Sequence, residues 1–244
     1  MELDVVMPAY NEEHRIGRTL SAYRSVLAGP AVRFWIALDA PADGTPAVVE
    51  RHRREDARIH ILRCPKLGKG GVIAEALRRC SADAIAVVDA DGSTPPGELL
   101  RLVRTARSAD GAIASRRHPS AFLPARRTLV RRSMSAGFSA GVRRLFRLPF
   151  LDTQCGAKVL SRDLVRDALP RLTATDFLFD VDLLVAAREL GYEVVEVPTI
   201  WIDKEGSNVE SLDALRMAAS ALRLWRRRRA MAASGSPGEV RRSA

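Results

Sequence analysis

The chain has 244 residues, of which 47% are hydrophobic and 28% are charged, proportions that favour a folded globular protein over a disordered or fibrous one. Its three cysteines lie far apart in the sequence, which excludes a C-x-x-C metal or redox pair and argues against a disulfide framework. The formal net charge is +10, and no stretch reaches the roughly 18 consecutive apolar residues of a membrane span.

Short apolar runs rich in β-forming residues alternate with helical patterns through the first half of the chain. The runs are too short for buried helices and predict strands near 5–7, 34–38, 59–62, 84–88 and 111–115. Apolar residues at three- and four-residue spacing predict helices over 12–28, 45–55, 70–80 and 96–108. The second half is less regular and predicts helices over 126–147, 179–190 and 209–229, with strands near 157–160 and 193–200.

This alternation predicts an α/β fold with a mostly parallel central sheet and helices on both faces. We expect one domain over 1–233 and a disordered tail over 234–244, which begins Ser-Gly-Ser-Pro-Gly. Ligands of such sheets bind beyond the carboxyl ends of the strands. Polar residues follow several predicted strands at that position: Pro8 to Glu12, Asp39, Asp89 to Ser93, and Arg116 with Arg117. The sequence therefore predicts a binding site at this rim of the sheet.

Two carboxylates, Asp89 and Asp91, stand two residues apart after the apolar run 84–88. If strand geometry persists, both side chains point to the same side. Neighbouring carboxylates repel unless a cation lies between them, and Mg²⁺ or Mn²⁺ binds such oxygens together with phosphate. A D-x-D pair also arises by chance, and Asp180 and Asp182 form a second one. The strand end and the helix start that follows favour the first pair as metal ligands.

The glycine-rich segment from Leu67 to Gly71 precedes a predicted helix and would suit a phosphate placed beside Lys69 and backbone N–H groups. It lacks the P-loop spacing, and Ile73 stands where G-x-G-x-x-G requires its last glycine. These departures disfavour a P-loop ATPase and an NAD-dependent dehydrogenase. A solvated lysine in a surface loop is an equally good interpretation of the segment alone.

Seven segments together resemble family 2 glycosyltransferases of the GT-A fold. Within that family they look most like the dolichyl-phosphate glucosyltransferases and mannose synthases, which load a sugar from a nucleotide donor onto a polyprenyl phosphate. The segments are Met7-Pro-Ala-Tyr-Asn-Glu12, Gly68-Lys-Gly70, Val88-Asp-Ala-Asp-Gly92, Ala114-Ser-Arg116, Asp152-Thr-Gln-Cys-Gly-Ala-Lys158, Phe179-Asp-Val-Asp-Leu-Leu184 and Glu205-Gly-Ser207. They occur in the family's order, and the fifth and sixth are the most specific to the polyprenyl-phosphate branch.

The resemblance implies a nucleotide-sugar-binding half over 1–117. Its residues, by position, are Pro8, Tyr10 and Glu12 at the nucleoside, Asp39 at the base, Lys69 near the nucleotide, and Asp89, Ala90 and Asp91 at the nucleotide sugar. Asp89 and Asp91 would also hold Mg²⁺ or Mn²⁺. The sequence Leu38-Asp-Ala-Pro-Ala-Asp-Gly44 departs from the usual D-D-G-S, so it leaves open whether Asp39 or Asp43 reads the base.

The resemblance also implies an acceptor-binding half over 118–233 that includes the final helix. Gln154 would touch the sugar or the acceptor, and Asp180 aligns with the acid that acts as base in relatives with hydroxyl acceptors. The candidate catalytic residues are thus Asp91, Gln154 and Asp180.

The positive charge is concentrated in two stretches of the sequence. Nine arginines and no acid occur over 116–147, and seven arginines against one acid occur over 223–244. Segregated charge indicates an anionic partner. An acceptor phosphate is already largely dianionic at neutral pH and needs cations, not a base. Arg116, Arg117, Arg131 and Ser135 are the candidate ligands, because the arginine fork suits phosphate oxygens; a solvated helix face is the alternative for most of these arginines.

The final predicted helix is amphipathic and ends in four arginines, Arg226 to Arg229. Such a helix either lies on an anionic membrane surface or simply covers the sheet. The N-terminus lacks a signal-peptide pattern. We therefore expect a cytoplasmic protein, free or peripheral on the inner face of the membrane.

The leading hypothesis is a metal-dependent inverting transferase that moves a hexose from a UDP- or GDP-sugar to a polyprenyl phosphate. A second hypothesis keeps this donor and uses a soluble hydroxyl acceptor in a natural-product or glycoconjugate pathway. A third, a basic nucleic-acid-binding module, is disfavoured because aromatic residues are only 5% and do not interleave with the arginines.

Overall fold

Strands and helices alternate along the chain as the sequence predicts. The computed structural model describes residues 1–124, 129–202 and 211–233, and within these the side chains of 129–136, 211–216 and 232–233 lie outside the description. The strands are β1 (Leu3–Ala9), β2 (Val32–Asp39), β3 (Ile59–Cys64), β4 (Ala84–Val87), β5 (Gly111–Ser115), β6 (Lys158–Ser161) and β7 (Val194–Pro198). The helices are α1 (Ile16–Val26), α2 (Thr45–Glu55), α3 (Gly68–Leu77), α4 (Pro96–Thr105), α5 (Leu129–Phe146), α6 (Arg162–Ala168), α7 (Phe179–Glu189) and α8 (Ser211–Ala233).

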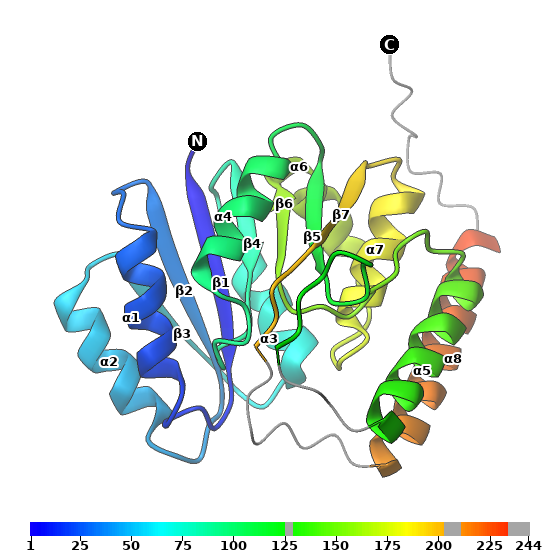
Figure 1. The fold of residues 1–244 in the computed structure, drawn as a ribbon, viewed down its shortest axis with the longest axis horizontal. Coiled ribbons are helices and arrows are strands. Elements are labelled where there is room, and N and C mark those ends of the chain that lie inside the picture. Colours follow the sequence, from blue (N-terminus) through cyan, green and yellow to red (C-terminus); the bar gives the residue numbers. More distant parts are fainter. Residues whose placement is uncertain (125–128, 203–210, 234–244) are drawn as a thin grey trace.

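These strands form one sheet in the order β3-β2-β1-β4-β6-β5-β7. Neighbours run parallel except at β6, which is antiparallel to both β4 and β5. The parallel strands start near the N-terminus at the top of Figure 1 and end at the lower edge of the sheet. Their carboxyl ends therefore meet at one rim, which is where the sequence places its polar residues.

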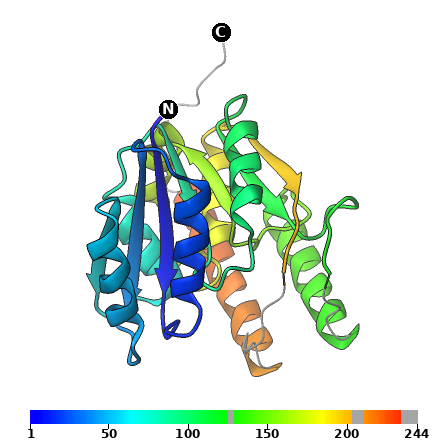
Figure 2. The same cartoon turned by 60° about the vertical axis from the view of Figure 1, so that its left-hand side comes forward.

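Helices cover both faces of the sheet because alternate strand residues enter different cores. Val5 and Met7 of β1 pack in a core with residues of α1, α2 and α4, whereas Val6 between them packs with residues of α3, α6 and α7. Figures 1 and 2 show α1 and α4 on one side of the sheet and α3 on the other. A third core joins α5, α7 and α8 beside β5. The predicted α/β fold with a mostly parallel, two-sided sheet is confirmed.

Two local details differ from the sequence prediction. The strand predicted over 84–88 ends at Val87, so Asp89 and Asp91 lie in a turn and not on a strand. This turn is set by Gly92, whose φ is +74°, a left-handed conformation that favours glycine. The helix α6 was not predicted, because its seven residues are too few to establish a helical period; the Ser161 hydroxyl caps it by accepting a hydrogen bond from Leu164 N at 3.2 Å.

The helix α8 begins and ends within a few residues of the predicted bounds 209–229. Ala221 and Leu224 are buried, whereas Leu222 is exposed. Arg228 is also buried and donates from Nε to Asp182 Oδ1 on α7 at 2.8 Å. The other oxygen of Asp182 accepts hydrogen bonds from the amides of Thr173 and Ala174. One member of the arginine run is thus an internal counter-ion.

Every helix within the described ranges is too short or too polar to traverse a bilayer.

A buried carboxylate, Asp4 of β1, joins three segments at the end of the sheet opposite the rim. It accepts hydrogen bonds from Arg33 Nε at 2.7 Å, from Trp35 Nε1 at 3.2 Å, and from the amides of Ser81 and Ala82. Burial raises the pKa of Asp4, but these hydrogen bonds outweigh burial, so its pKa lies below the usual range.

We expect Asp4→Asn to lower the free energy of unfolding by about 3 kcal/mol, because it leaves Arg33 without its partner and puts an amide N–H₂ against backbone donors. Since the folded-state pKa is depressed, the contribution of Asp4 is present above the unfolded pKa of about 4 and is lost as the pH falls through the folded value. Urea denaturation at neutral and acidic pH measures both effects. Asp163→Asn, at a side chain that is 47% exposed, serves as control, and equal stability of the two variants would contradict the prediction.

Candidate active site

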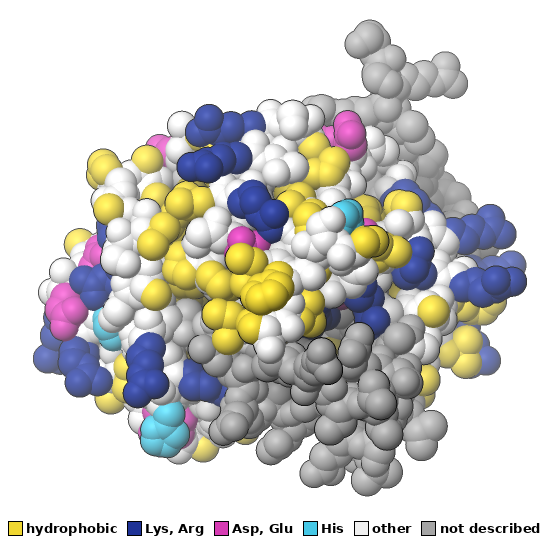
Figure 3. Space-filling model, viewed as in Figure 1, with side chains coloured by type: hydrophobic (Ala, Val, Ile, Leu, Met, Phe, Trp, Pro, Cys, Tyr) yellow, Lys and Arg dark blue, Asp and Glu magenta, His cyan; other side chains and the backbone are white. Residues whose placement is uncertain are grey.

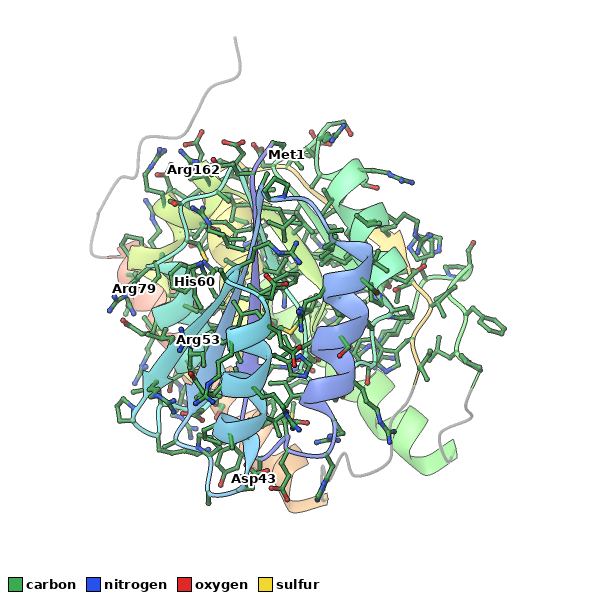
Figure 4. All side chains as sticks on the ribbon, turned by 90° about the vertical axis from the view of Figure 1, so that its left-hand side faces the viewer. Met1, Asp43, Arg53, His60, Arg79 and Arg162 are labelled. Carbon is green, nitrogen blue, oxygen red and sulfur yellow. The ribbon has the colours of Figure 1, made fainter. Side chains whose placement is uncertain are left out.

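The rim formed by the carboxyl ends of the strands carries most of the predicted site residues. Figure 4 places Asp43 at this edge, at the opposite end of the molecule from Met1 and Arg162. Asp89 follows β4 here, and the ammonium of Lys69, from the first turn of α3, lies 2.7 Å from Asp89 Oδ1. Burial raises the pKa of Asp89, but Lys69, Lys158 and Arg116 outweigh burial and hold it below the usual range. Asp89 is therefore ionised at neutral pH.

A second ion pair lies beneath the first. Lys158 of β6 and Asp180 of α7 are both buried, and Lys158 Nζ is 2.5 Å from Asp180 Oδ1. The pairs act on each other, since Lys158 lowers the pKa of Asp89, while Asp180 helps to raise the pKa of Lys69 above its usual range despite the opposing effect of burial. We call Lys69, Asp89, Lys158 and Asp180 the four-charge cluster, in which two acids are balanced by two lysines.

Gly156 lies directly against Asp89. A Cβ added to Gly156 would be 1.9 Å from Asp89 Oδ2, which is far closer than non-bonded atoms approach. The absence of a side chain at Gly156 therefore lets the carboxylate of Asp89 occupy its position.

Asp91 stands outside these pairs. Its Oδ1 accepts a hydrogen bond from Ser93 N at 2.8 Å, and within the described residues its carboxylate forms no ion pair. The neighbouring Glu12 is already bound by Arg15, with Nε 2.7 Å from Oε2. Burial is the main reason that the pKa of Glu12 is raised, and repulsion from Asp91 and Asp89 adds to it. Of these three carboxylates, Asp91 is therefore the one whose negative charge has no ion-pair partner among the described residues.

This charge fits a divalent cation that is only partly bound by protein. The described residues contain no group of three or more His, Cys, Asp or Glu side chains that could hold a metal ion unaided. Mg²⁺ and Mn²⁺ commonly take one or two carboxylates and complete their shells with phosphate oxygens and water. The donor set of Asp91 and Asp89 is compatible with that arrangement.

The residues predicted at the nucleoside surround the ends of β1 and β2. Pro8 is half-buried and Tyr10 exposed, and the ammonium of Lys66 lies 2.9 Å from the centre of the Tyr10 ring. Asp39 is buried; its Oδ1 accepts from Leu67 N at 2.6 Å, and its Oδ2 lies 3.0 Å from Lys66 Nζ.

Asp43 has an equally defined local role. Its Oδ1 accepts hydrogen bonds from the amide and hydroxyl of Thr45, and its Oδ2 accepts from Glu13 N at 3.1 Å. Asp43 therefore holds the start of α2 against the loop that follows β1, while Asp39 holds the loop before α3.

The glycine-rich segment differs from its predicted role. The amides of Leu67 and Gly68 donate to Asp39, and those of Gly70 and Gly71 donate to Thr175 O at 2.9 and 3.1 Å. The expectation that these amides face a phosphate is therefore wrong. Their function is to pack α3 against the loop 173–178, since a Cβ on Gly70 would be 2.8 Å from Asp176 O. The side chain of Lys69 is what this segment contributes to the rim.

Arg116 also differs from its predicted role as a free phosphate ligand. Its Nε and Nη2 donate to the two oxygens of buried Asp152 at 2.7 and 2.9 Å, and Nη2 also donates to Gln154 O. The guanidinium lies over the ring of Trp201, 4.9 Å from its centre. Because the fork is already filled by Asp152, Arg116 fixes the segment that leads to Gln154 and Gly156.

The remaining acceptor candidates lie on this side of the rim or beyond the description. Gln154 is half-buried and donates from Nε2 to Phe177 O at 3.3 Å. Arg117 follows Arg116 and is half-buried. The side chains of Arg131 and Ser135 on α5 lie outside the described residues, as does the segment 205–207.

Asp180 is placed differently from an exposed general base. It is 5% exposed and its carboxylate is bound to Lys158, an arrangement that favours a role as counter-ion. Sequence reasoning missed Lys158 and Gly156 as individuals, although both lie in the segment 152–158. One feature of the sequence could have identified Lys158, because a lysine at the start of a buried apolar strand needs an acidic partner.

Comparisons with known proteins find relatives that cover most of the chain. The sequence model of the family described as Glycosyl transferase family 2 matches residues 4–169. The chain is 32% identical to glycosyltransferase AglD of Haloferax volcanii over 92% of its own length but spans only 37% of that protein. It is 30% identical to a dolichyl-phosphate beta-glucosyltransferase of Trichomonas vaginalis, covering 90% of this chain and 69% of that one. Identity to the undecaprenyl-phosphate mannosyltransferase of Micrococcus luteus is also 30%, over 84% and 85% of the two chains.

Among solved structures, glucosyl-3-phosphoglycerate synthase from Mycobacterium tuberculosis, in complex with Mn²⁺, UDP and glucosyl-3-phosphoglycerate, has a TM-score of 0.67 at 18% identity. The likeness covers 91% of this chain and 78% of that one, and it shows a common GT-A fold. With the family match extending over more than half of the sequence, this chain belongs to glycosyl transferase family 2 and is a glycosyltransferase.

Proposed function

We propose that this glycosyltransferase transfers a hexose from a UDP- or GDP-sugar to a polyprenyl phosphate with inversion of configuration. An oxygen of the acceptor phosphate would form a bond to the anomeric carbon while the bond to the nucleoside diphosphate breaks. Relatives named for transfer to dolichyl and undecaprenyl phosphate support this acceptor class. The observation that carries the proposal is the pairing of Asp180 with Lys158. A phosphate acceptor needs no base, whereas a hydroxyl acceptor does.

On the donor side, we propose that Asp91 and Asp89 hold Mg²⁺ or Mn²⁺ together with the nucleotide phosphates. When bound, such an ion would stabilise the negative charge that grows on the departing nucleoside diphosphate. Lys69 would contribute a further positive charge from α3. The proposed nucleotide-sugar half, 1–117, would place Pro8, Tyr10, Glu12, Asp39 and Ala90 around the donor.

On the acceptor side, we propose that the half over 118–233 receives the phosphate with Gln154, Arg117, Arg131 and Ser135. Because Arg116 is bound to Asp152, we propose that it acts by positioning Gln154. Two anions must approach each other in this reaction, so cations from this half are needed to offset their repulsion.

The proposal is tested by incubating the purified protein with Mn²⁺, a panel of UDP- and GDP-sugars and a polyprenyl phosphate, and by detecting the glycolipid by mass. We expect a product that carries one hexose and appears only when metal, donor and acceptor are all present. Transfer to a soluble alcohol without any transfer to polyprenyl phosphate would contradict it.

The hydroxyl-acceptor alternative is tested at the buried pair. Asp180→Asn alone leaves Lys158 buried without a partner and is expected to lower stability, so we pair it with Lys158→Met to remove both charges together. With polyprenyl phosphate we expect the double variant to keep turnover within about tenfold of wild type, because no proton must be removed, whereas loss of a general base costs about 10²- to 10⁴-fold. The measurements are the initial rates and melting temperatures of both variants. A loss of turnover of more than about tenfold in a stably folded double variant would favour the hydroxyl acceptor.

A further inference from the structure

Four large apolar side chains are exposed together beside the rim. Phe122 is 60% exposed and Ile200 41%, and Leu123 and Ile202 are similarly open to solvent. Phe122 and Ile200 form a parallel bridge. We call Phe122, Leu123, Ile200 and Ile202 the apolar ledge. Hydrophobic side chains gather in the middle of the face shown in Figure 3, over the segment that continues β7. Exposed apolar clusters of this kind commonly mark binding surfaces.

The backbone beneath the ledge is already hydrogen-bonded. The amides of Thr199, Ile200, Trp201 and Ile202 donate to Ser115 O, Glu98 Oε2, Phe122 O and Ser93 O. Phe122 N in turn donates to Thr199 O at 3.0 Å. A peptide that bound by adding a strand to the sheet would need free backbone amides on this segment, and these amides are already used. The ledge therefore suits a ligand that offers apolar contact and requires no backbone hydrogen bonds.

The apolar ledge adjoins Asp91, the candidate metal ligand. Ile202 N donates to Ser93 O at 2.9 Å, and Ser93 N donates to Asp91 Oδ1 at 2.8 Å. Trp201, between the two exposed isoleucines, is buried and points the other way, against the guanidinium of Arg116. One side of this segment thus supports Arg116 and the other presents the ledge.

We infer that the apolar ledge binds the isoprenoid chain of the acceptor and guides its phosphate end to the rim beside Asp91. This inference rests on the proposed polyprenyl phosphate acceptor. An isoprenoid chain is aliphatic, uncharged and without hydrogen-bond donors, which matches a surface of four apolar side chains over a satisfied backbone. The sequence of both contributing stretches, 119–124 and 199–202, contains no charged residue.

The test is the dependence of activity on the length of the acceptor chain. Wild type, the double variant Phe122→Ser/Ile200→Ser and the control Val26→Ser are assayed with methyl phosphate, which has no isoprenoid chain, and with undecaprenyl phosphate in one detergent. Val26 on α1 is exposed to a degree similar to Ile200 and lies away from the ledge. We expect the double variant to raise KM for undecaprenyl phosphate about tenfold, since two apolar contacts are lost. Its kcat and its KM for methyl phosphate should stay at wild-type values, and Val26→Ser should behave as wild type.

Unchanged KM for undecaprenyl phosphate in the double variant, or an equal rise for both acceptors, would overturn the inference. Sedimentation with anionic vesicles that lack acceptor tests whether the ledge contacts the bilayer instead. In that case the double variant would lose vesicle binding while its KM for undecaprenyl phosphate in detergent stayed unchanged. If wild type transfers sugar to neither phosphate, the proposed function itself fails. If wild type transfers sugar but the double variant shows the same change in KM for both acceptors, only the inference about the apolar ledge is refuted.

Discussion

Asp91→Ala is expected to lose metal-dependent donor binding and to reduce turnover by about 10³-fold, the loss typical when one electrostatic contact to the reacting group is removed. Asp89 is compensated by Lys69 and Glu12 by Arg15, so Asp91 is the carboxylate whose charge is left for a cation. Its hydrogen bond to Ser93 N is a single local contact. We therefore expect the melting temperature to change little.

The measurement is titration of UDP and GDP into wild type and variant, with Mn²⁺ and again with excess chelator. Wild type should bind nucleotide more tightly with the metal, and Asp91→Ala should bind equally weakly in both conditions. Asp163→Ala on α6, a carboxylate remote from the rim whose side chain is 47% exposed, serves as the control. Metal-enhanced nucleotide binding that survives in Asp91→Ala would show that the cation is held elsewhere.

Gly156→Ala is expected to reduce turnover by at least about 10²-fold through a single added methyl group. The new Cβ would meet Asp89 Oδ2 at 1.9 Å, so the carboxylate or the backbone of the 152–158 segment must move. Either movement separates Asp89 from Lys69 or shifts Gln154, and misplacement of about 1 Å at a reacting site costs on this scale. Overpacking of this kind also lowers stability by about 1–3 kcal/mol.

Gly141→Ala on α5 is the matched control, since no described atom lies within 4 Å of its added Cβ and alanine favours the helix. Both variants are compared by kcat, by donor binding and by thermal unfolding. A folded Gly156→Ala protein with wild-type kcat would mean that the position of Asp89 does not matter for catalysis.

The sequence predicts the fold well because its signals are local. Runs such as 34–38 and helical spacing such as that of Ile16 and Leu20 depend on neighbours a few residues away, and the parallel sheet follows from their alternation. The position of Asp89 and Asp91 at a strand end follows from the same reasoning. Only their placement in a turn required the structure, because Val87 and Val88 are equally apolar.

The partners of the charged residues were not predictable in the same way. Arg116 and Asp152 are separated by 36 residues, and Lys158 and Asp180 by 22. Local patterns do not encode such pairings. Composition reveals an excess of arginine but not which guanidinium groups are already used inside the protein. For this reason Arg116 is a candidate phosphate ligand by sequence although its guanidinium is bound to Asp152. The glycine-rich amides likewise suit a phosphate by sequence, but they donate to Asp39 and Thr175.

The buried contact between Arg228 and Asp182 changes how the basic end of α8 should be studied. Deleting the C-terminus would strip an internal acid of its counter-ion and loosen the amides of Thr173 and Ala174, next to the carbonyl of Thr175 that holds α3. A shortened protein that failed to bind vesicles could then simply be a damaged enzyme. Alanine at the exposed Arg226, Arg227 and Arg229, with Arg228 retained, removes surface charge and leaves the ion pair between Arg228 and Asp182 intact.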